Sequence, residues 1–329
     1  MRTFTSVGLV GVLAASALVL GPAGASLSSS AAAASADHLH TPPPVCVNAA
    51  PPSASNSPRS PRKVCSPWHA RDVWASGTPS VYTDTFVADR SQPTVVADAA
   101  WIRVATTDLA LYPGYKGPGL TTLPKGAMMV PLSGRSRLLA TFNSGFYESD
   151  GAAGFYVNHT LYFPMIVGLA TLVRYSNGTV NIITWTGGAR PGPSIMMARQ
   201  NLPLLVAHSA PTPRSATNSL WGLTLHGVPD VWRTAVGVTA SGDLIYAAAP
   251  AQTAASMAHV MLVLHCVRAM QLDINPEWPI FVTYAAPGAQ GPSLFVPNPN
   301  QIPGRFLYPS TKDFFAVYSS VKAGAPQPW

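Results

Sequence analysis

The sequence contains few charged side chains, and carboxylates are the scarcest of them. Only 10% of the 329 residues are charged, and 13 Asp and Glu stand against 20 Lys and Arg. Glutamate occurs only at Glu148 and Glu277. Chemistry that depends on a carboxylate is therefore restricted to a small number of positions in this chain.

The positive charges are not arranged for nucleic acid. The net charge is +7, which suits polyanions such as nucleic acid, anionic lipid or phosphorylated glycan. The sequence nevertheless has no basic stripe interleaved with aromatics of the kind that binds single-stranded nucleic acid. We expect no nucleic-acid partner and favour a phosphorylated glycan, with a basic protein that has no polyanionic partner as the alternative.

Cysteine is scarce as well. The chain has three cysteines, and none has the paired histidine spacing of a zinc site. Cys46 and Cys65 flank a Pro- and Ser-rich loop, which predicts a disulfide in an oxidising compartment. Cys266 fits a buried small hydrophobe in an apolar helical pattern. We predict no metal and no cofactor, although a divalent ion could accompany Asp273 next to a phosphate.

The sequence has no apolar run long enough to cross a bilayer. Residues 7–20 form an apolar run of 14, whereas a spanning helix needs roughly 20. The run follows Arg2 and precedes Ala-x-Ala patterns at 23–25 and 34–36, so all three parts of a secretory signal are present. We predict a signal peptide over residues 1–36, with an uncleaved N-terminal anchor as the alternative. The protein is then secreted or in the cell envelope, with no stable membrane insertion after signal removal.

The rest of the chain divides by composition. Residues 37–64 are rich in Ala, Ser and Pro and cannot bury enough apolar surface to offset the entropy of ordering, which predicts a disordered spacer. Residues 65–329 have the length of a single large β-rich domain. Its short β-branched segments predict strands, and turn signals at 158–159, 177–178 and 241–242 predict three hairpins.

One helix is predicted from a cap at Ser256 onward. Met257, Val260, Met261 and Leu264 recur there at helical spacing, and the pattern leads into a short strand ending at Asp273. The predicted fold class is α+β: a mostly antiparallel β-sheet with packed helices and long loops.

Three polar clusters lie at the ends of predicted strands, where a rigid sheet presents functional groups. The first covers 142–151 and includes Asn143, Ser144 and Gly145; the second covers 273–278; the third is Arg233 with Thr234. Each cluster alone is also typical of turns and caps, and Arg233 could simply pair with Asp230.

Taken in order, these motifs resemble the phosphodiester glycosidase domain over about residues 95–320. An Asn-x-Gly-Phe-aromatic turn at 143–147, an Arg-Thr-Ala-x-Gly strand at 233–237 and a helix leading to Leu-Asp at 272–273 occur in the family's order. The family includes the catalytic domain that removes N-acetylglucosamine from its phosphodiester to uncover mannose 6-phosphate. It also includes many exported bacterial proteins.

The sequence departs from the family pattern directly after Asp273. The family has glycines and serines there, whose backbone N–H groups can cradle a phosphate, whereas this chain has Ile-Asn-Pro-Glu-Trp at 274–278. Pro276 offers no N–H. Glu277 could instead supply a second carboxylate and Trp278 a stacking face for a sugar.

The resemblance implies an exported hydrolase that removes a sugar from a sugar-1-phosphodiester on an envelope or environmental glycan. Arg233 would hold the leaving phosphate, and Asp273 would activate water or stabilise an oxocarbenium-like centre with Glu277 as a second carboxylate. The implied substrate-binding residues are Asn143, Ser144, Gly145, Arg233, Thr234, Asn275 and Trp278. The altered loop leaves a non-catalytic phosphoglycan-binding module of the same fold as the alternative, and a structural envelope protein as a third.

Overall fold

The computed structural model describes residues 42–48, 63–75, 77–89, 92–119, 123–151 and 153–320. The predicted signal peptide and residues 49–62 of the predicted spacer lie outside these ranges. The described residues belong to one compact unit. Within them, no helix has the length and hydropathy needed to cross a membrane.

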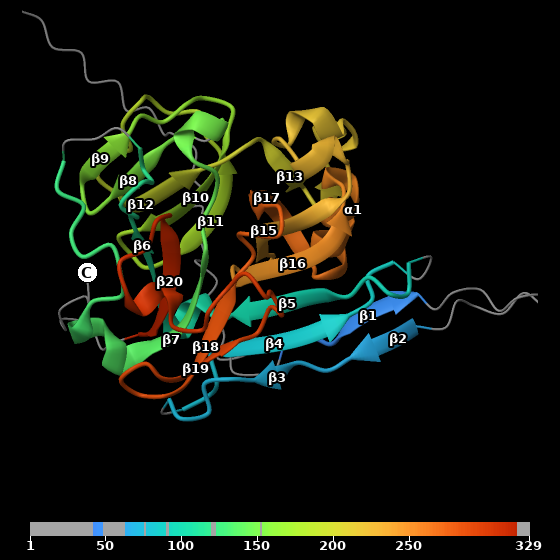
Figure 1. Cartoon of the computed structure of the whole chain (residues 1–329), viewed down its shortest axis with the longest axis horizontal. Helices are drawn as coiled ribbons and strands as arrows, with labels where there is room; N and C mark the ends of the chain where they lie inside the picture. Colours follow the sequence, from blue (N-terminus) through green and yellow to red (C-terminus); the bar gives the residue numbers. More distant parts are fainter. Residues whose placement is uncertain are drawn as a thin grey trace, which may run out of the picture. The chain divides into compact units, whose positions relative to one another are not determined.

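The largest sheet has eight strands, all paired antiparallel (Figure 1). Their order across the sheet is β14 (Ala210–Pro211), β13 (Leu204–Ala207), β17 (Cys266–Ile274), β15 (Val231–Thr239), β16 (Leu244–Gln252), β5 (Ala97–Ile102), β4 (Val81–Phe86) and β3 (His69–Ala70). The central strands are buried on both faces and carry Ala, Val and Ile in place of alternating polar residues.

Two five-stranded antiparallel sheets complete the core. One has the order β11 (Val180–Thr184), β10 (Ala170–Tyr175), β12 (Ile195–Gln200), β8 (Phe155–Val157) and β9 (Thr160–Phe163). The other has the order β19 (Gln290–Leu294), β18 (Phe281–Ala286), β7 (Leu138–Asn143), β20 (Phe314–Ser319) and β6 (Thr107–Tyr112). A single apolar cluster joins all three large sheets, with Leu109 of β6, Leu172 of β10 and Tyr246 of β16 among its members.

The expected α+β class with several packed helices is wrong, because the fold is largely β. In the part of the chain that the structure describes, α1 (Ala254–Val263) is the only α-helix. The other helical segments are short 3-10 turns: η2 (Val104–Thr106), η3 (Leu132–Arg137), η4 (Glu148–Asp150), η5 (Pro213–Ala216), η6 (Asn218–Leu220), η7 (Leu225–Gly227) and η8 (Arg305–Leu307). Proline and glycine, which are frequent in this chain, are both unfavourable inside a helix.

The helix that does form begins earlier than predicted. Thr253 is its N-cap, and Ser256 occupies the third helical position, where the two residues exchange the hydrogen bonds of a capping box. The helix ends at Val263, so Cys266 opens β17 and is not helical. Gly237 allows the close approach of this segment, because a Cβ there would lie 2.5 Å from Cys266 Sγ.

All three predicted hairpins are confirmed. Asn158 and His159 join β8 to β9 with φ of 47° and 62°, the left-handed pair of a tight hairpin turn. The 177–178 turn joins β10 to β11, and the 241–242 turn joins β15 to β16. Local turn chemistry fixes these connections without reference to the rest of the fold.

Part of the predicted spacer is ordered, which corrects the boundary at residue 64. Residues 45–48 form β1 (Val45–Asn48), which pairs with β2 (Lys63–Ser66). Cys46 lies opposite Cys65 in this pair, and a disulfide joins them. Val45 and Val47 are buried in the cluster that contains Trp68. The alternating Val-Cys-Val sequence therefore forms a strand although the surrounding residues are rich in Ala, Ser and Pro.

Candidate functional site

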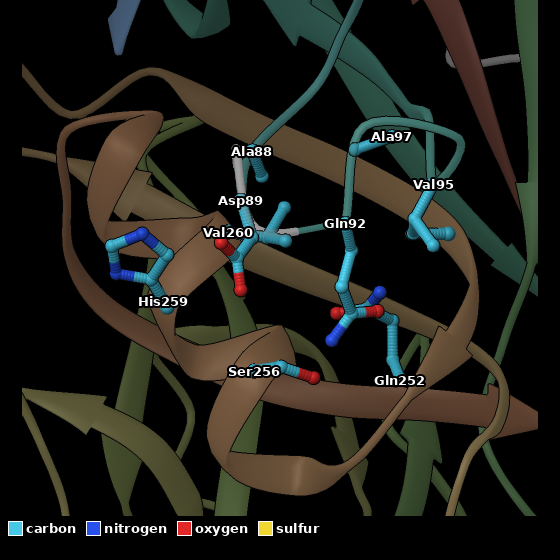
Figure 2. Close-up of a pocket in the computed structure, with 10 residues that line it drawn as sticks. Ala88, Asp89, Gln92, Val95, Ala97, Gln252, Ser256, His259 and Val260 are labelled. Carbon is cyan, nitrogen blue, oxygen red and sulfur yellow. The ribbon is translucent and has the colours of Figure 1, made fainter. Parts of the chain in front are cut away.

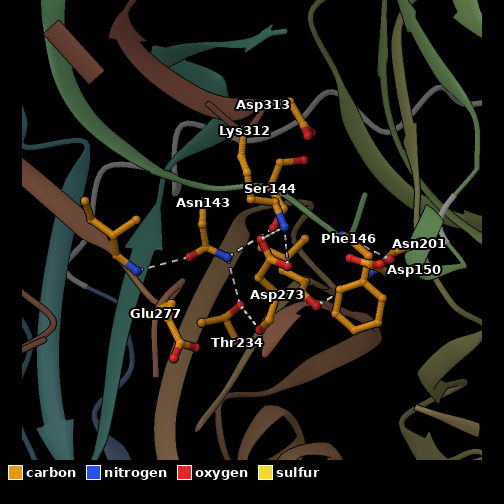
Figure 3. A network of polar contacts seen from close by, with 12 residues as sticks. Asn143, Ser144, Phe146, Asp150, Asn201, Thr234, Asp273, Glu277, Lys312 and Asp313 are labelled. Carbon is orange, nitrogen blue, oxygen red and sulfur yellow. Dashed lines mark hydrogen bonds and ion pairs between the residues drawn. The ribbon is translucent and has the colours of Figure 1, made fainter. Parts of the chain in front are cut away.

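Asp273 lies near the end of β17, with 2% of its surface exposed. Its backbone N–H donates to Ser144 O (3.2 Å), and its backbone C=O accepts from Thr234 Oγ1 (2.7 Å). Three segments that are distant in the sequence thus meet at the backbone of Asp273 (Figure 3). The polar clusters around 143, 234 and 273 therefore lie together.

Asn143 positions this junction and is fully occupied in doing so. Its Nδ2 donates to Thr234 Oγ1 (2.9 Å) and to Ser144 O (3.1 Å). Its Oδ1 accepts from Tyr246 Oη (2.9 Å) and from the N–H of Ile280 (3.2 Å). Four hydrogen bonds use both donors and both lone pairs of the amide. Asn143 therefore supports the site from behind and has no capacity left for a sugar.

Lys312 is the partner of the Asp273 carboxylate. Its Nζ donates to Oδ1 at 2.8 Å and lies 2.7 Å from Oδ2 without hydrogen-bond geometry to that atom. The ammonium also lies 4.2 Å from the ring centroid of Tyr147 and 4.3 Å from that of Trp278, within cation–π range of both. The lysine is 4% exposed. A buried ion pair is thus enclosed by two aromatic rings.

Burial controls the acidity of this pair. It raises the pKa of Asp273 to about 7, while the positive charge of Lys312 and its hydrogen bond pull in the opposite direction. The net effect places the carboxyl near neutrality, where it can both accept and release a proton. A raised pKa also means that folding stability supplied by this group is complete at low pH and is lost as pH rises through about 7.

The ion pair faces a cavity of about 320 Å³. The cavity is lined by Phe146, Ser149, Asp150, Leu223, Asp273, Ile274, Asn275, Trp278 and Lys312. Of the predicted site residues, Asp273, Asn275 and Trp278 therefore meet here. Arg305 lies over the Trp278 ring at 5.7 Å from its centroid. The cavity combines the buried carboxylate of Asp273, the exposed carboxylate of Asp150, an ammonium, an aromatic face and an aliphatic wall.

Arg233, expected to hold phosphate, is committed elsewhere. It is 0% exposed, and it is not among the residues that line the cavity. All five of its N–H donors are directed at neutral acceptors: Gln252 O, Trp221 O, Gln271 Oε1, Asn218 Oδ1 and Pro229 O. Burial lowers its pKa to about 10, so it stays a cation at neutral pH. It does not pair with Asp230 in an ion pair within the described part.

The remaining predicted residues are at the margins of the site. Glu277 is exposed and does not line the cavity, and Figure 3 shows its carboxylate apart from the Asp273–Lys312 pair. Ser144 is fully buried, and its Oγ has no hydrogen-bond partner among the described residues. Gly145 packs on Asn201, whose Cγ would lie 3.1 Å from an added Cβ. Thr234 is taken up by Asn143 and the Asp273 backbone.

Sequence reasoning missed Lys312 and the residue beside it. Asp313 forms a buried ion pair with Arg199 at 2.8 Å, and Arg199 in turn donates to the backbone oxygens of Phe146 and Ala153. This second pair fixes the loop that carries Phe146 and Tyr147. The only sequence signal was two adjacent charges directly before the apolar strand at 314–319, in a region that reads as irregular because of its prolines.

A second, smaller cavity of about 110 Å³ lies beside α1 (Figure 2). Ser256 and His259 line it, which superficially resembles a nucleophile and base. The Ser256 hydroxyl is engaged in the helix cap, where it accepts from Thr253 N–H and donates to Thr253 O. His259 is exposed. Across the described residues, no group of three or more His, Cys, Asp or Glu is placed to hold a metal ion.

No protein-family model matches the sequence, and no curated protein matches it significantly. Among solved structures, one similar chain is the zebrafish N-acetylglucosamine-1-phosphodiester alpha-N-acetylglucosaminidase catalytic domain, auto-inhibited by its pro-peptide. The TM-score is 0.48 at 14% identity over 78% of this chain and 89% of that one. A hypothetical protein from Synechocystis has a TM-score of 0.43 at 11% identity, over 73% and 62% of the two chains. A Burkholderia pseudomallei protein described as exported has 0.41 at 13%, over 68% and 74%.

Proposed function

We propose that the protein is an extracytoplasmic hydrolase of sugar phosphodiesters and that Asp273 and Lys312 carry the reaction. The observation that carries the proposal is the buried Asp273–Lys312 pair, which opens into a cavity with an aromatic face. The ordered motifs of the phosphodiester glycosidase family support it from the sequence. A pair of this kind in a concave site is also where functional pKa shifts concentrate.

Asp273 acts as the general base. Its pKa of about 7 is close to working pH, which is the condition under which a carboxylate accepts a proton from water most effectively. Water adds its oxygen to the anomeric carbon, and its proton passes to Asp273. The bond between that carbon and the phosphate oxygen breaks, and the electron pair leaves with the phosphate monoester.

Lys312 takes the role that the sequence assigned to Arg233. An ammonium has three N–H donors, and Asp273 engages one of them in hydrogen-bond geometry. Because Lys312 lines the cavity, the charge faces a bound phosphodiester and stabilises the leaving phosphate. Trp278 supplies a flat apolar face on which a sugar ring can stack, and Asn275 borders the same space.

One observation favours the binding module as a second candidate. Glu277 is exposed and outside the cavity, so Asp273 is the only buried carboxylate that lines it. Glycosidases usually use two carboxylates. A phosphate is a good leaving group and reduces the need for a second acid, but a site whose other carboxylate, Asp150, is exposed also suits binding without cleavage.

The test is release of reducing sugar from α-N-acetylglucosamine-1-phosphodiesters and related sugar-1-phosphodiesters by the full chain. Asp273→Asn should lower release by about 100- to 10,000-fold, the usual contribution of a positioned base. Asp230→Asn is the matched control, since Asp230 is exposed and outside the cavity. Absence of release by the folded parent protein across the panel would reject the hydrolase, and calorimetric binding of the same compounds would then identify the binding module.

A further inference from the structure

A loop beside the cavity presents four aliphatic side chains to solvent. The leucine loop, defined here as residues 218–228, includes Leu220 (50% exposed), Leu223 (95%), Leu225 (41%) and Val228 (46%). Single exposed aliphatic residues are common on protein surfaces, whereas several on one short segment next to a cavity mark an interaction site.

The side chains of the leucine loop are exposed although hydrogen bonds hold its backbone in place. Trp221 is fully buried and donates from Nε1 to Arg214 O at 2.9 Å. Arg233 donates to Trp221 O (3.1 Å) and to Asn218 Oδ1 (3.0 Å), which fixes the start of the loop to the large sheet. The buried arginine therefore acts as the anchor of the leucine loop.

The other end of the loop is held by Asn275, which itself lines the cavity. Its Oδ1 accepts from the N–H of Leu225 at 3.0 Å, and its Nδ2 donates to Leu223 O at 3.2 Å. Gly222, with φ of +91°, passes so close to the cavity wall that an added Cβ would lie 2.6 Å from the Phe146 ring. Hydrogen bonds from Asn275 and the glycine at 222 thus hold the loop with Leu223 exposed to solvent.

Leu223 connects this surface to the chemistry. It lines the same cavity as Asp273 and Lys312, together with Phe146 and Ile274. Leu223 therefore offers an aliphatic contact, in the same cavity, to a group that extends from a phosphate held at Lys312. The surface is therefore continuous with the proposed catalytic site.

We propose that the leucine loop binds an aliphatic aglycone, so that the substrate is a sugar phosphodiester of a long-chain alcohol. This inference rests on the proposed function for the sugar end of the substrate only. Burying exposed leucine against an alkyl chain removes apolar surface from water, and the loop needs no reordering because its backbone is already fixed.

A bilayer surface is the competing occupant, and the composition of the loop argues against it. Interfacial segments combine apolar residues with Lys or Arg and an exposed Trp. Residues 218–228 contain no Lys or Arg, and their Trp221 is buried. A single bound chain that continues from the cavity fits these features better than an anionic membrane.

The test compares octyl phosphate with methyl phosphate by titration calorimetry, with octyl phosphate below its micellar concentration. The parent protein should bind the octyl compound at least about tenfold more tightly, and Leu223→Ser should remove most of that ratio. Leu132→Ser is the matched control, because Leu132 is 77% exposed and outside the cavity lining. Equal affinities for the two phosphates in the parent protein would overturn the inference.

Two further arms separate this inference from the proposed function. Octyl and methyl diesters of α-N-acetylglucosamine-1-phosphate are offered as substrates in parallel. Turnover without any chain-length preference in binding or rate would reject the aliphatic aglycone and leave the hydrolase standing. Chain-length-dependent binding without turnover would reject the hydrolase and leave the aliphatic site. Sedimentation of the parent, but not Leu223→Ser, with phosphatidylcholine–phosphatidylglycerol vesicles and no octyl preference would overturn the inference in favour of a membrane surface.

Discussion

Lys312 and Arg233 are both buried cations, but their surroundings differ. Lys312 meets a carboxylate, is flanked by two aromatic rings and borders a cavity. Arg233 donates to five neutral oxygens and does not line the cavity that contains Asp273. The charge of Lys312 is therefore available to a ligand in the cavity. Every N–H donor of Arg233 is used in hydrogen bonds within the protein.

The difference shows how little residue type alone says about a role. The planar fork of arginine suits phosphate, but the same five donors also suit a cluster of carbonyl and amide oxygens. Lysine is the less specific phosphate ligand, yet its position beside Asp273 gives it the access that Arg233 lacks. Access to the cavity, and not the match of donor geometry, decides which cation can bind a ligand.

The largest expected effect on stability is that of removing Arg233. Arg233→Ala should lower the free energy of unfolding by about 4 kcal/mol, because buried acceptors lose a charged donor. Urea denaturation followed by circular dichroism measures this value. Arg214→Ala, at an exposed arginine, should stay within about 0.5 kcal/mol of the parent. If Arg233→Ala were as stable as Arg214→Ala, the anchoring role of Arg233 would be wrong.

Lys312 should have a smaller and pH-dependent effect on stability. Its charge lowers the pKa of Asp273, so Lys312→Met should raise that pKa above about 7. Below the raised pKa Asp273 stays protonated and little is lost, whereas at pH 8.5 an unpaired buried carboxylate should cost roughly 1–3 kcal/mol. Urea denaturation at pH 5 and pH 8.5 measures the difference.

The same variant tests the mechanism. The pH at which sugar release reaches half its maximum should move to higher pH in Lys312→Met, because the ionised form of Asp273 is the proposed base. The double variant with Asp273→Asn should lose the added pH dependence of stability. A pH profile that does not move would show that Lys312 and Asp273 do not share this titration.

The smallest expected effect concerns the unpartnered hydroxyl of Ser144. Ser144→Ala should leave stability unchanged or raise it by up to about 1 kcal/mol, because a buried group without a hydrogen bond contributes nothing favourable. Ser215→Ala is the matched control and should cost about 1 kcal/mol, since the Ser215 Oγ donates to Thr212 O. Thermal denaturation compares the two. Loss of sugar release in Ser144→Ala with unchanged stability would place this hydroxyl in substrate binding.

Local signals predicted much of the fold. The hairpin turns at 158–159, 177–178 and 241–242 and the pairing of Cys46 with Cys65 depend on nearby residues, and the structure has all four. The predicted fold class was wrong because one amphipathic helical pattern was taken to indicate several helices. The order of the sheets is set by long-range pairing, which short-range periodicity does not encode.

The same dependence on long-range pairing explains why only part of the site was predicted. Asp273, Asn275 and Trp278 come from one continuous motif and meet in the cavity. Lys312 arrives from a separate segment, and only the pairing of β20 with β6 and β7 brings it there. Arg233 was assigned to phosphate because the sequence shows its donors but not the acceptors that occupy them.

The position of β20 has a consequence for how the chain reaches its native state. β20 lies between β7 and β6, so two strands that were made more than 170 residues earlier are joined in one sheet only when it arrives. Contacts of such separation carry a large loop-closure entropy and slow the search for the folded state. The protein should therefore fold slowly, with the Asp273–Lys312 pair completed last, and a chain cut before residue 312 would lack that pair whatever its sheets retained.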